Sequence, residues 1–275
     1  MGLRVLATPN SLPGHNYRMA RQRCSVTILT YNEESNLADC LAGLEWADEI
    51  VVVDSGSTDR TLEIARRAAA TVYVNPWPGF TEQKNFAAGK ASHPWILNLD
   101  ADERVTPELR EAILRVLDRP ERDGYEIPRA NHFLGRRMRR GGWYPDRVLR
   151  LYRREAAQFG GLEPHAKVFL DQGEPGRIEV PLVHYTYRNL TQFIAKQPPY
   201  AEATARARFE AGRRYACVPL RIFVKPLWKF FELYLWKLGA LDGVHGLIAA
   251  LGYSYRTYLQ EARFWELSRD GSRPK

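Results

Sequence analysis

Residues 24–54 read CSVTILTYNEESNLADCLAGLEWADEIVVVD, and this stretch decides the class of fold. It begins with an apolar run, CSVTILT, that is typical of a buried strand. The following segment, residues 35–47, places Leu37, Leu41 and Leu44 on one face of a helix. EIVVVD then predicts a second buried strand. Two buried strands joined by a helix predict a right-handed crossover and a parallel sheet covered on both faces.

The same alternation continues further along the chain. Short apolar runs at residues 71–74 (TVYV) and 95–100 (WILNLD) predict two more strands. Helices are expected at residues 57–69, 81–91 and 106–117. Ser57 or Thr58 is a suitable cap for the first of these helices, and Pro107 suits the first turn of the last. The sequence therefore predicts an α/β protein with a mostly parallel sheet.

The chain has 275 residues, of which 45% are hydrophobic and 12% aromatic, so it can form a large packed core. We interpret residues 1–23 as a loose basic leader without the apolar run of a signal peptide. Residues 24–188 are predicted to form the α/β domain, which becomes a mixed region of strands and turns after Gly124. Residues 189–275 are predicted to form a helical, aromatic-rich extension. No apolar stretch approaches the roughly 20 residues that cross a bilayer.

The net charge and the cysteine content indicate which partners and which cellular location to expect. The net charge is +8, and two segments carry most of it: residues 136–154 hold eight Arg and one Asp, and residues 206–229 hold seven Lys or Arg and one Glu. Such basic surfaces attract the phosphates of a nucleotide, a nucleic acid or a membrane. Three cysteines without metal-ligand spacing favour reduced thiols and a cytoplasmic location.

Polar clusters follow three of the predicted strands, with the sequences TYNEE, DSGSTD and DADE. Ligands of such sheets bind beyond the carboxyl ends of the strands, so the three clusters are expected to face one crevice. Asp100 and Asp102 flank Ala101 there and repel each other unless solvent, a proton or a cation intervenes. Mg²⁺ or Mn²⁺ typically takes one or two carboxylates together with substrate phosphates, and a diphosphate would complete the ligand set.

The second cluster and the following helix suggest contacts to a nucleotide. Gly56 permits a tight turn ahead of a helix N-terminus. Asp54 ends a strand and could accept hydrogen bonds from a sugar hydroxyl or a base N–H. Lys84 and Asn85 lie on the next helix, where a cation can meet a phosphate.

Four motifs occur in order along the first half of the chain: VTILTYNEE, VVVDSGSTDRT, QKNFA and LNLDADE. In this order and spacing they resemble the inverting family 2 glycosyltransferases of GT-A fold. The second half contains NHFLG, GGWYPDRVLRLYRR, HYTYRN and LDGVHGL, and it is similar to bacterial enzymes that add sugars to lipopolysaccharide core or related envelope glycans. The resemblance covers about residues 24–265.

The resemblance implies a nucleotide-sugar donor, a glycan or glycolipid acceptor and a Mg²⁺ or Mn²⁺ ion. It places the base, most often uracil, at Asp54 and the metal at Asp102. Asp100 is expected beside the ribose and the metal, and Lys84 near the nucleotide. The other residues expected at the nucleotide are Thr30, Tyr31, Asn32, Glu33, Gly56, Asn85 and Ala101.

An inverting transferase needs a general base for the acceptor hydroxyl, and the sequence leaves its identity open. Similar envelope enzymes often carry a His-Glu pair near the stretch GGLEPHAKV, but here Ala166 follows His165. Glu163 is the first candidate, with His165 and Asp146 behind it.

Each of these residues also has an ordinary structural interpretation. Asp102 could cap the next helix, and Lys84 could be a solvated helix residue. Glu33 could simply start a helix. His184 is more typical of a buried, hydrogen-bonded histidine than of a ligand.

Two segments of the second half leave alternatives open. The Arg-rich segment is a solvated face or, through the glycines and rings of residues 141–144, a flexible loop over a sugar. Residues 223–241, FVKPLWKFFELYLWKLGAL, predict a helix packed on the domain or on another subunit, or an interfacial helix on anionic lipid at the inner face of the cytoplasmic membrane.

Two other functions compete with sugar transfer. A nucleotidyltransferase usually has a Gly-rich basic loop after the first strand, which TYNEE lacks. A nucleic-acid-binding protein would suit the positive charge but leaves three acidic strand ends unexplained, so no nucleic-acid partner is expected.

Overall fold

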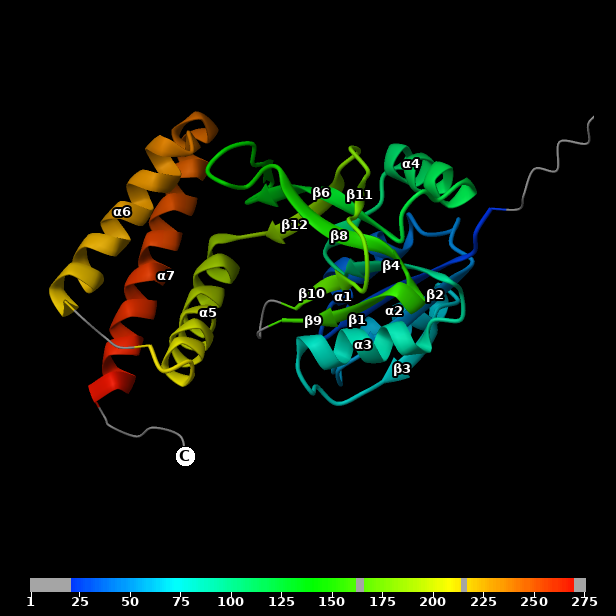
Figure 1. Ribbon diagram of the computed structural model, residues 1–275, viewed down its shortest axis with the longest axis horizontal. Coiled ribbons are helices and arrows are strands. Elements are labelled where there is room, and N and C mark those ends of the chain that lie inside the picture. Colours follow the sequence, from blue (N-terminus) through cyan, green and yellow to red (C-terminus); the bar gives the residue numbers. More distant parts are fainter. Residues whose placement is uncertain (1–20, 162–165, 214–216, 270–275) are drawn as a thin grey trace, which may run out of the picture.

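The computed structural model describes residues 21–161, 166–213 and 217–269. It has two parts, a twisted sheet flanked by helices and a lobe of long helices at one end (Figure 1). Within the described residues the main sheet has ten strands, in the order β3-β2-β1-β4-β8-β6-β12-β5, with β7 and β11 paired to β6. The fold is α/β, as predicted.

The first half of the sheet is parallel and carries the polar crevice. Its strands are β1 (Cys24–Thr30), β2 (Glu49–Asp54), β3 (Thr71–Val74) and β4 (Trp95–Asp100). β1 lies in the centre, paired in parallel with β2 on one side and β4 on the other. Because all four strands run the same way, their carboxyl ends meet at one edge of the sheet.

Helices cover both faces of this parallel half. They are α1 (Glu34–Leu41), α2 (Thr61–Arg67), α3 (Phe80–Lys90) and α4 (Pro107–Asp118). α1, α2 and α4 pack on one face in the largest hydrophobic cluster, against Val26, Ile28 and Leu97. α3 packs on the other face through Ala87, which contacts Val51 and Val53.

The second half of the sheet is mixed, as expected for the region after Gly124. β8 (Asp146–Arg153) runs antiparallel to β4 and to β6 (Gly124–Phe133), and β12 (Leu182–Tyr187) runs parallel to β6. β5 (Glu103–Arg104) follows the DADE turn and pairs with β12, which brings His184 opposite Glu103. The remaining short strands are β7 (Arg136–Arg137), β9 (Ala157–Gly160), β10 (Lys167–Leu170) and β11 (Gly176–Arg177).

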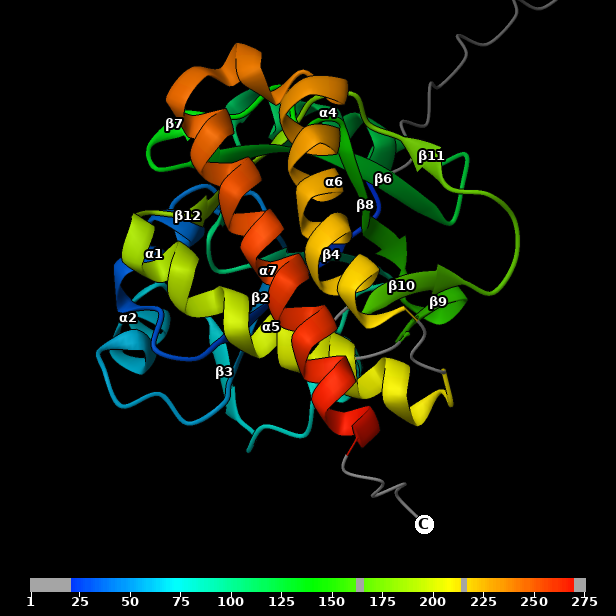
Figure 2. The ribbon, with the colours of Figure 1, turned by 90° about the vertical axis from the view of Figure 1, so that its left-hand side faces the viewer.

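The helical lobe begins after β12 with α5 (Leu190–Glu210), which Asn189 caps by accepting a hydrogen bond from the main-chain N–H of Gln192. A continuous helical segment follows, made of η2 (Leu220–Val224), α6 (Lys225–Phe231) and η3 (Glu232–Trp236). A short turn, η4 (Gly239–Asp242), leads to α7 (Gly243–Arg269), which packs between α5 and α6 (Figure 2). None of the helices described is long and apolar enough to span a bilayer.

An aromatic cluster joins the lobe to the sheet. Phe133 of β6, Tyr187 of β12 and Phe193 of α5 pack with Trp143 and with Ala249 of α7. Since Trp143 is buried in this cluster, its ring belongs to the core. The prediction of a flexible loop with free rings at residues 141–144 is therefore wrong for that side chain.

Two local predictions in the first half are also corrected. α1 ends at Leu41 and not near residue 47. α2 begins at Thr61, and neither Ser57 nor Thr58 caps it, because the Ser57 hydroxyl donates to Asp54 instead. The division of the chain at residues 23 and 188 stays a prediction.

Candidate functional site

The loops that follow β1 and β2 are joined by hydrogen bonds at the crevice. The Asn32 main-chain N–H donates to Ser57 Oγ at 2.8 Å, and the Thr58 main-chain N–H donates to Asn32 Oδ1 at 2.9 Å. Asn32 sits in the left-handed region with φ 54°, which asparagine tolerates well. The side chain of Asn32 is thus used to hold the two loops together, while Tyr31 beside it is 61% exposed and can stack on a ligand.

Asp54 lies beneath these loops and is fully buried. Its Oδ1 accepts from the main-chain N–H groups of Gly56 and Ser57 at 2.9 and 2.7 Å. Its Oδ2 accepts from the hydroxyls of Thr30 and Ser57 at 2.9 and 2.5 Å. Four hydrogen bonds satisfy the carboxylate, so Asp54 shapes the turn at Gly56 and leaves no oxygen for a base. The neighbouring Ser55, held by Gln83 at 3.0 Å, is better placed at the surface of the crevice.

Two carboxylates of the DADE turn, Asp100 and Glu103, are paired with cationic side chains of the protein. Arg150 of β8 donates to Asp100 at 2.6 Å and to Glu103 at 2.5 Å, and Lys84 of α3 donates to Asp100 at 3.0 Å. Burial alone would raise the pKa of Asp100, but the charges of Arg150 and Lys84 hold that pKa well below its usual range. Cations of the protein itself therefore neutralise Asp100 and Glu103, two of the three carboxylates in the DADE turn.

Asn98 completes this network from the strand itself. Its Oδ1 accepts from Lys84 Nζ at 3.2 Å and from Arg150 at 3.1 Å, deep in the sheet. Lys84 is 7% exposed and makes two of its three possible hydrogen bonds inside the protein. The third proton is the one that could meet a phosphate.

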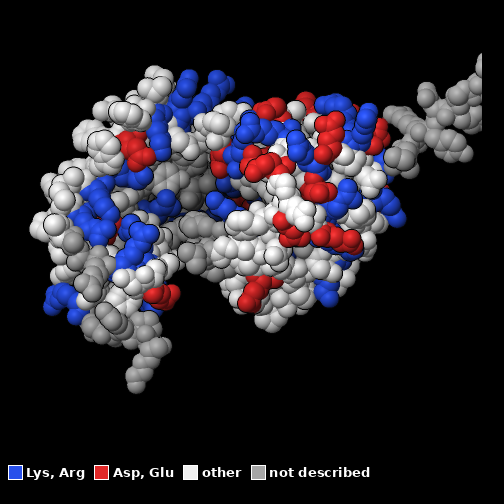
Figure 3. Space-filling view, viewed as in Figure 1, with Lys and Arg blue, Asp and Glu red and all other residues white. Residues whose placement is uncertain are grey.

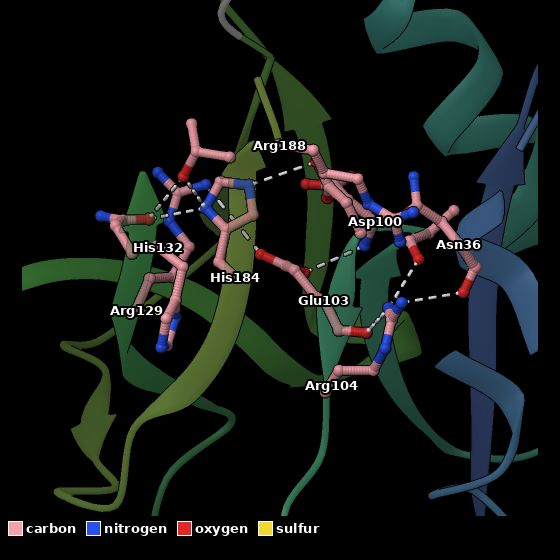
Figure 4. A network of polar contacts seen from close by, with 12 residues as sticks. Asn36, Asp100, Glu103, Arg104, Arg129, His132, His184 and Arg188 are labelled. Atoms are coloured by element: carbon pink, nitrogen blue, oxygen red, sulfur yellow. Dashed lines mark hydrogen bonds and ion pairs between the residues drawn. The ribbon is translucent and has the colours of Figure 1, made fainter. Parts of the chain in front are cut away.

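Asp102 stands apart from the other two carboxylates. Within the three described ranges, no Lys or Arg nitrogen lies within ion-pair distance of it, and its nearest basic partner is His184 Nε2 of β12 at 3.5 Å. The Asp102 side chain is 23% exposed. Figure 4 shows the surrounding network, with His184 and Arg129 on one side and Asp100, Arg188 and Asn36 on the other. Asp102 is the carboxylate of the DADE turn that remains available to a ligand.

Asn131 of β6 fixes the orientation of the His184 ring. Its Nδ2 donates to Asp146 Oδ2 at 3.1 Å and to the Trp143 carbonyl at 2.9 Å, so its Oδ1 is an acceptor. His184 Nδ1 lies 2.6 Å from this Oδ1 and must therefore carry the proton. The ring then turns Nε2 to the side of Asp102, where it lies 3.5 Å from Asp102 Oδ2.

This donor set suits a divalent cation. Histidine ligands commonly donate their second ring N–H to a fixed oxygen, as His184 does to Asn131. Two ligands of one octahedral ion lie about 3 Å apart, which agrees with the separation of Asp102 and His184. No group of three or more His, Cys, Asp or Glu is arranged for a metal in the part of the chain that the structure describes, so substrate oxygens would have to supply the other ligands.

A cavity of about 460 Å³ adjoins this pair and lies between the sheet and the helical lobe. His184, Asn131 and Asp146 line it from the sheet, and Lys229 and Arg256 line it from the lobe. Asp146 Oδ2 is held by Arg129 at 2.7 Å. The volume falls in the range of pockets for small molecules.

The other predicted residues have varied positions. Glu33 accepts a hydrogen bond from Asn36 at 2.6 Å. The pKa of its carboxyl is raised, mainly by burial and to a smaller extent by the charge of nearby Asp102. Ala101 is buried. The Asn85 side chain donates to the Phe159 carbonyl at 3.0 Å and accepts from the Phe159 N–H at 2.9 Å, so it anchors β9. Glu163 and His165 lie outside the described residues.

Sequence reasoning missed Arg150 and Asn131, and it placed His184 with ordinary buried histidines. Arg150 is one of eight Arg in its segment, and nothing local separates it from the solvent-exposed ones. A signal for the other two existed, because NHFLG and HYTYRN contain Asn131 and His184.

The fold and the site define an α/β protein in which, among the residues described, the carboxyl edge of the sheet carries Asp102 beside His184 and a cavity of about 460 Å³. The sequence profile of Glycosyl transferase family 2 matches residues 25–170. The chain belongs to this family, it is a glycosyltransferase, and its sheet and flanking helices form the GT-A fold.

The chain is similar to two related sequences and to one solved structure. The lipopolysaccharide core biosynthesis glycosyltransferase LpsC of Rhizobium meliloti is 30% identical over 266 residues, which cover 91% of this chain and 94% of LpsC. An uncharacterized glycosyltransferase of Rickettsia typhi is 26% identical, over 90% of this chain and 88% of its own. Among solved structures, S. aureus TarS 1-349 in complex with UDP-GlcNAc has a TM-score of 0.49 and 15% identity, covering 92% of this chain and 93% of TarS.

Proposed function

We propose that the protein transfers a sugar, with inversion, from a nucleotide-sugar donor to a lipopolysaccharide core or related envelope glycan. The observation that carries this proposal is the Asp102–His184 pair at the edge of the sheet, next to the cavity. The similarity to LpsC along nearly the whole chain supports an envelope-glycan acceptor. A uridine nucleotide is the donor that the sequence resemblance favours.

In this proposal Asp102 Oδ2 and His184 Nε2 hold Mg²⁺ or Mn²⁺. The ion, when bound, neutralises charge that grows on the diphosphate as the sugar leaves. Asn131 keeps Nε2 of His184 directed toward Asp102. Asp100, held by Arg150 and Lys84, keeps the turn in place and leaves Lys84 one proton for a phosphate oxygen.

Asp146 is the described candidate for the general base, beside Glu163 and His165. Its Oδ2 accepts from Arg129 and Asn131, and its Oδ1 has no hydrogen-bond partner among the residues with known positions. Asp146 lines the cavity, and its Oδ1 could take the acceptor proton.

A hydrolysis screen of nucleotide sugars with Mn²⁺ tests the donor half of the proposal without an acceptor. We expect one sugar nucleotide to be hydrolysed and the rate to disappear with chelator. If no nucleotide sugar is turned over, and UDP with Mn²⁺ does not raise the melting temperature, the proposed chemistry is refuted.

We further propose that the segment η2–α6–η3 lies on an anionic membrane surface. Its outward face is apolar: Leu220, Phe223, Leu227, Trp228, Phe231, Leu235 and Trp236 are 45–82% exposed. Its charged residues turn toward the protein instead, where Lys225 pairs with Glu261 at 2.9 Å. In Figure 3 the outer margin of the lobe is mostly uncharged, and Lys and Arg lie among uncharged residues further in from that margin. Exposed aromatic residues with nearby cations suit the headgroup region of an anionic membrane.

Vesicle sedimentation tests the membrane proposal. Wild type should bind phosphatidylglycerol vesicles at low salt, and Trp236→Glu should reduce binding about tenfold or more. Trp77→Glu is the matched control, because Trp77 is also half exposed but lies on the sheet domain. Equal loss with both variants, or a stable dimer in solution that shields the face, would contradict membrane binding.

A further inference from the structure

The cavity between the sheet and the helical lobe has a wall with no role in the chemistry proposed above. Lys229 of α6, Lys237 after η3 and Arg256 of α7 line it from the lobe. The opposite wall holds His184 and Asp146, which belong to the reaction site. A ligand in the cavity would therefore touch the reaction site with one end and three cationic side chains with the other.

The carboxylates on this wall are too few to neutralise its cations. Lys229 and Lys237 share one acidic partner, Glu232, with Nζ–O distances of 2.6 and 2.7 Å. The two lysines lower the pKa of the Glu232 carboxyl, which stays ionised at neutral pH. This group of three residues keeps one net positive charge.

Arg256 adds a second uncompensated charge. Within the described parts of the chain, no carboxylate lies within ion-pair distance of its guanidinium. The group instead lies over the Tyr253 ring at 4.6 Å and near the Tyr200 ring at 5.9 Å. A guanidinium over an aromatic ring is attracted to the ring without using its N–H donors, which can bind an oxyanion.

The cavity is held in shape by contacts between distant segments. Asp242 accepts hydrogen bonds from the main-chain N–H groups of Arg139 and Arg140, at 3.1 and 2.8 Å. The Gly141 N–H donates to the Lys237 carbonyl at 2.8 Å. A Cβ on Gly142 would lie 3.3 Å from the Lys237 side chain, so glycine at this position leaves room for the lysine beside the cavity.

We propose that this wall binds an anionic group of the acceptor, either a phosphate ester or a sugar carboxylate. The inference rests on the proposed transferase function, since it takes the cavity to be the acceptor site. The two uncompensated charges favour an anion, and Thr257 and Gln260, which also line the cavity, can form hydrogen bonds with a sugar attached to it. A neutral glycan would leave both positive charges without a partner.

Binding of small probes tests this inference without the natural acceptor. The donor site is first filled with saturating UDP and Mn²⁺, so that a phosphate probe cannot bind there. Glucose 6-phosphate, glucuronate and glucose are then titrated by calorimetry or ligand-observed NMR. We expect one or both anionic probes to bind at least about tenfold more tightly than glucose, and their relative affinities show whether phosphate or carboxylate is preferred.

Variants assign the binding to this wall. Arg256→Gln and Lys237→Gln should each weaken the anionic probe roughly tenfold to a hundredfold, the range for hydrogen bonds to charged groups. Arg256→Lys keeps the positive charge and should lose less affinity for the anionic probe than Arg256→Gln. Arg110→Gln, on exposed α4, is the matched control and should leave the affinity unchanged.

The outcomes separate the two proposals. If UDP binds but glucose binds as tightly as the anionic probes, or Arg256→Gln changes nothing, the anionic subsite is wrong and the transferase proposal stands. If UDP with Mn²⁺ does not bind wild type at all, both proposals fail. Loss of binding in Arg110→Gln equal to that in Arg256→Gln would also overturn the subsite.

Discussion

Replacing Arg150 with methionine should destabilise the protein strongly, because this one side chain neutralises two carboxylates inside the sheet. The Arg150 side chain is 4% exposed, Glu103 is fully buried, and Arg150 NH2 lies 2.6 Å from Asp100 and 2.5 Å from Glu103. Removing one partner of a buried ion pair typically costs about 3–5 kcal/mol, because a charge is left without compensation. For a chain of this size that corresponds to a fall in Tm of roughly 6–20 °C.

The loss should depend on pH in a defined direction. The pKa of Asp100 is depressed in the folded protein, so its ionic interactions stabilise the fold above the unfolded-state pKa, about 3.9, and this contribution fades as the pH falls through the lower folded-state value. The difference in the free energy of unfolding between wild type and Arg150→Met should therefore be largest at pH 7 and should shrink below about pH 4.

Unfolding by urea at several pH values, monitored by circular dichroism, measures this difference in the free energy of unfolding. The double variant Arg150→Met with Glu103→Gln supplies the control, because it removes the buried charge left behind and should recover about 1–3 kcal/mol. A loss below about 1 kcal/mol for Arg150→Met, or no recovery in the double variant, would refute the assignment of Arg150 as the counter-ion of the DADE turn.

Three further variants separate the roles at the crevice. Asp102→Asn should reduce Mn²⁺-dependent turnover about a hundredfold or more and weaken Mn²⁺ binding measured by electron paramagnetic resonance, while the Tm changes little. Asn131→Ala should weaken Mn²⁺ binding about 10- to 100-fold, because His184 loses the acceptor that orients its ring. Asn85→Ala should cost about 1–3 kcal/mol of stability through loss of the two bonds to Phe159, with KM for the nucleotide sugar unchanged. Near-wild-type Mn²⁺ affinity in the first two, or a raised KM without a stability loss in the third, would contradict these assignments.

Much of the fold could be predicted from local sequence, because it follows from the spacing of apolar residues. The runs at β1, β2 and β4 are nearly continuous, as strands buried on both faces require. Pro107 was predicted in the first turn of the helix at residues 106–117, and the structure confirms it as the first residue of α4, with Thr106 as the cap. The predicted end of the helix after β1 and the predicted start of the helix after β2 were less accurate: α1 ends at Leu41, and Ser57, which looked like a cap for α2, is bonded to Asp54 instead.

The candidate site was predictable only in part. That three polar clusters meet at one edge follows from parallel strands, and the sequence alone determined this feature. Which carboxylate is free could not be read from DADE, because the answer depends on charges that come from elsewhere in the chain.

The tertiary structure determines which carboxylate of the DADE turn is free to bind a ligand. β8 brings Arg150 to Asp100 across 50 positions of sequence, and β12 places His184 beside Asp102. Asp54, apparently the best ligand for a base, is turned inward by four hydrogen bonds. Apolar periodicity is a property of neighbouring residues and can be read along the chain, whereas the charge state and availability of a carboxylate depend on which distant cations the fold brings within a few ångströms.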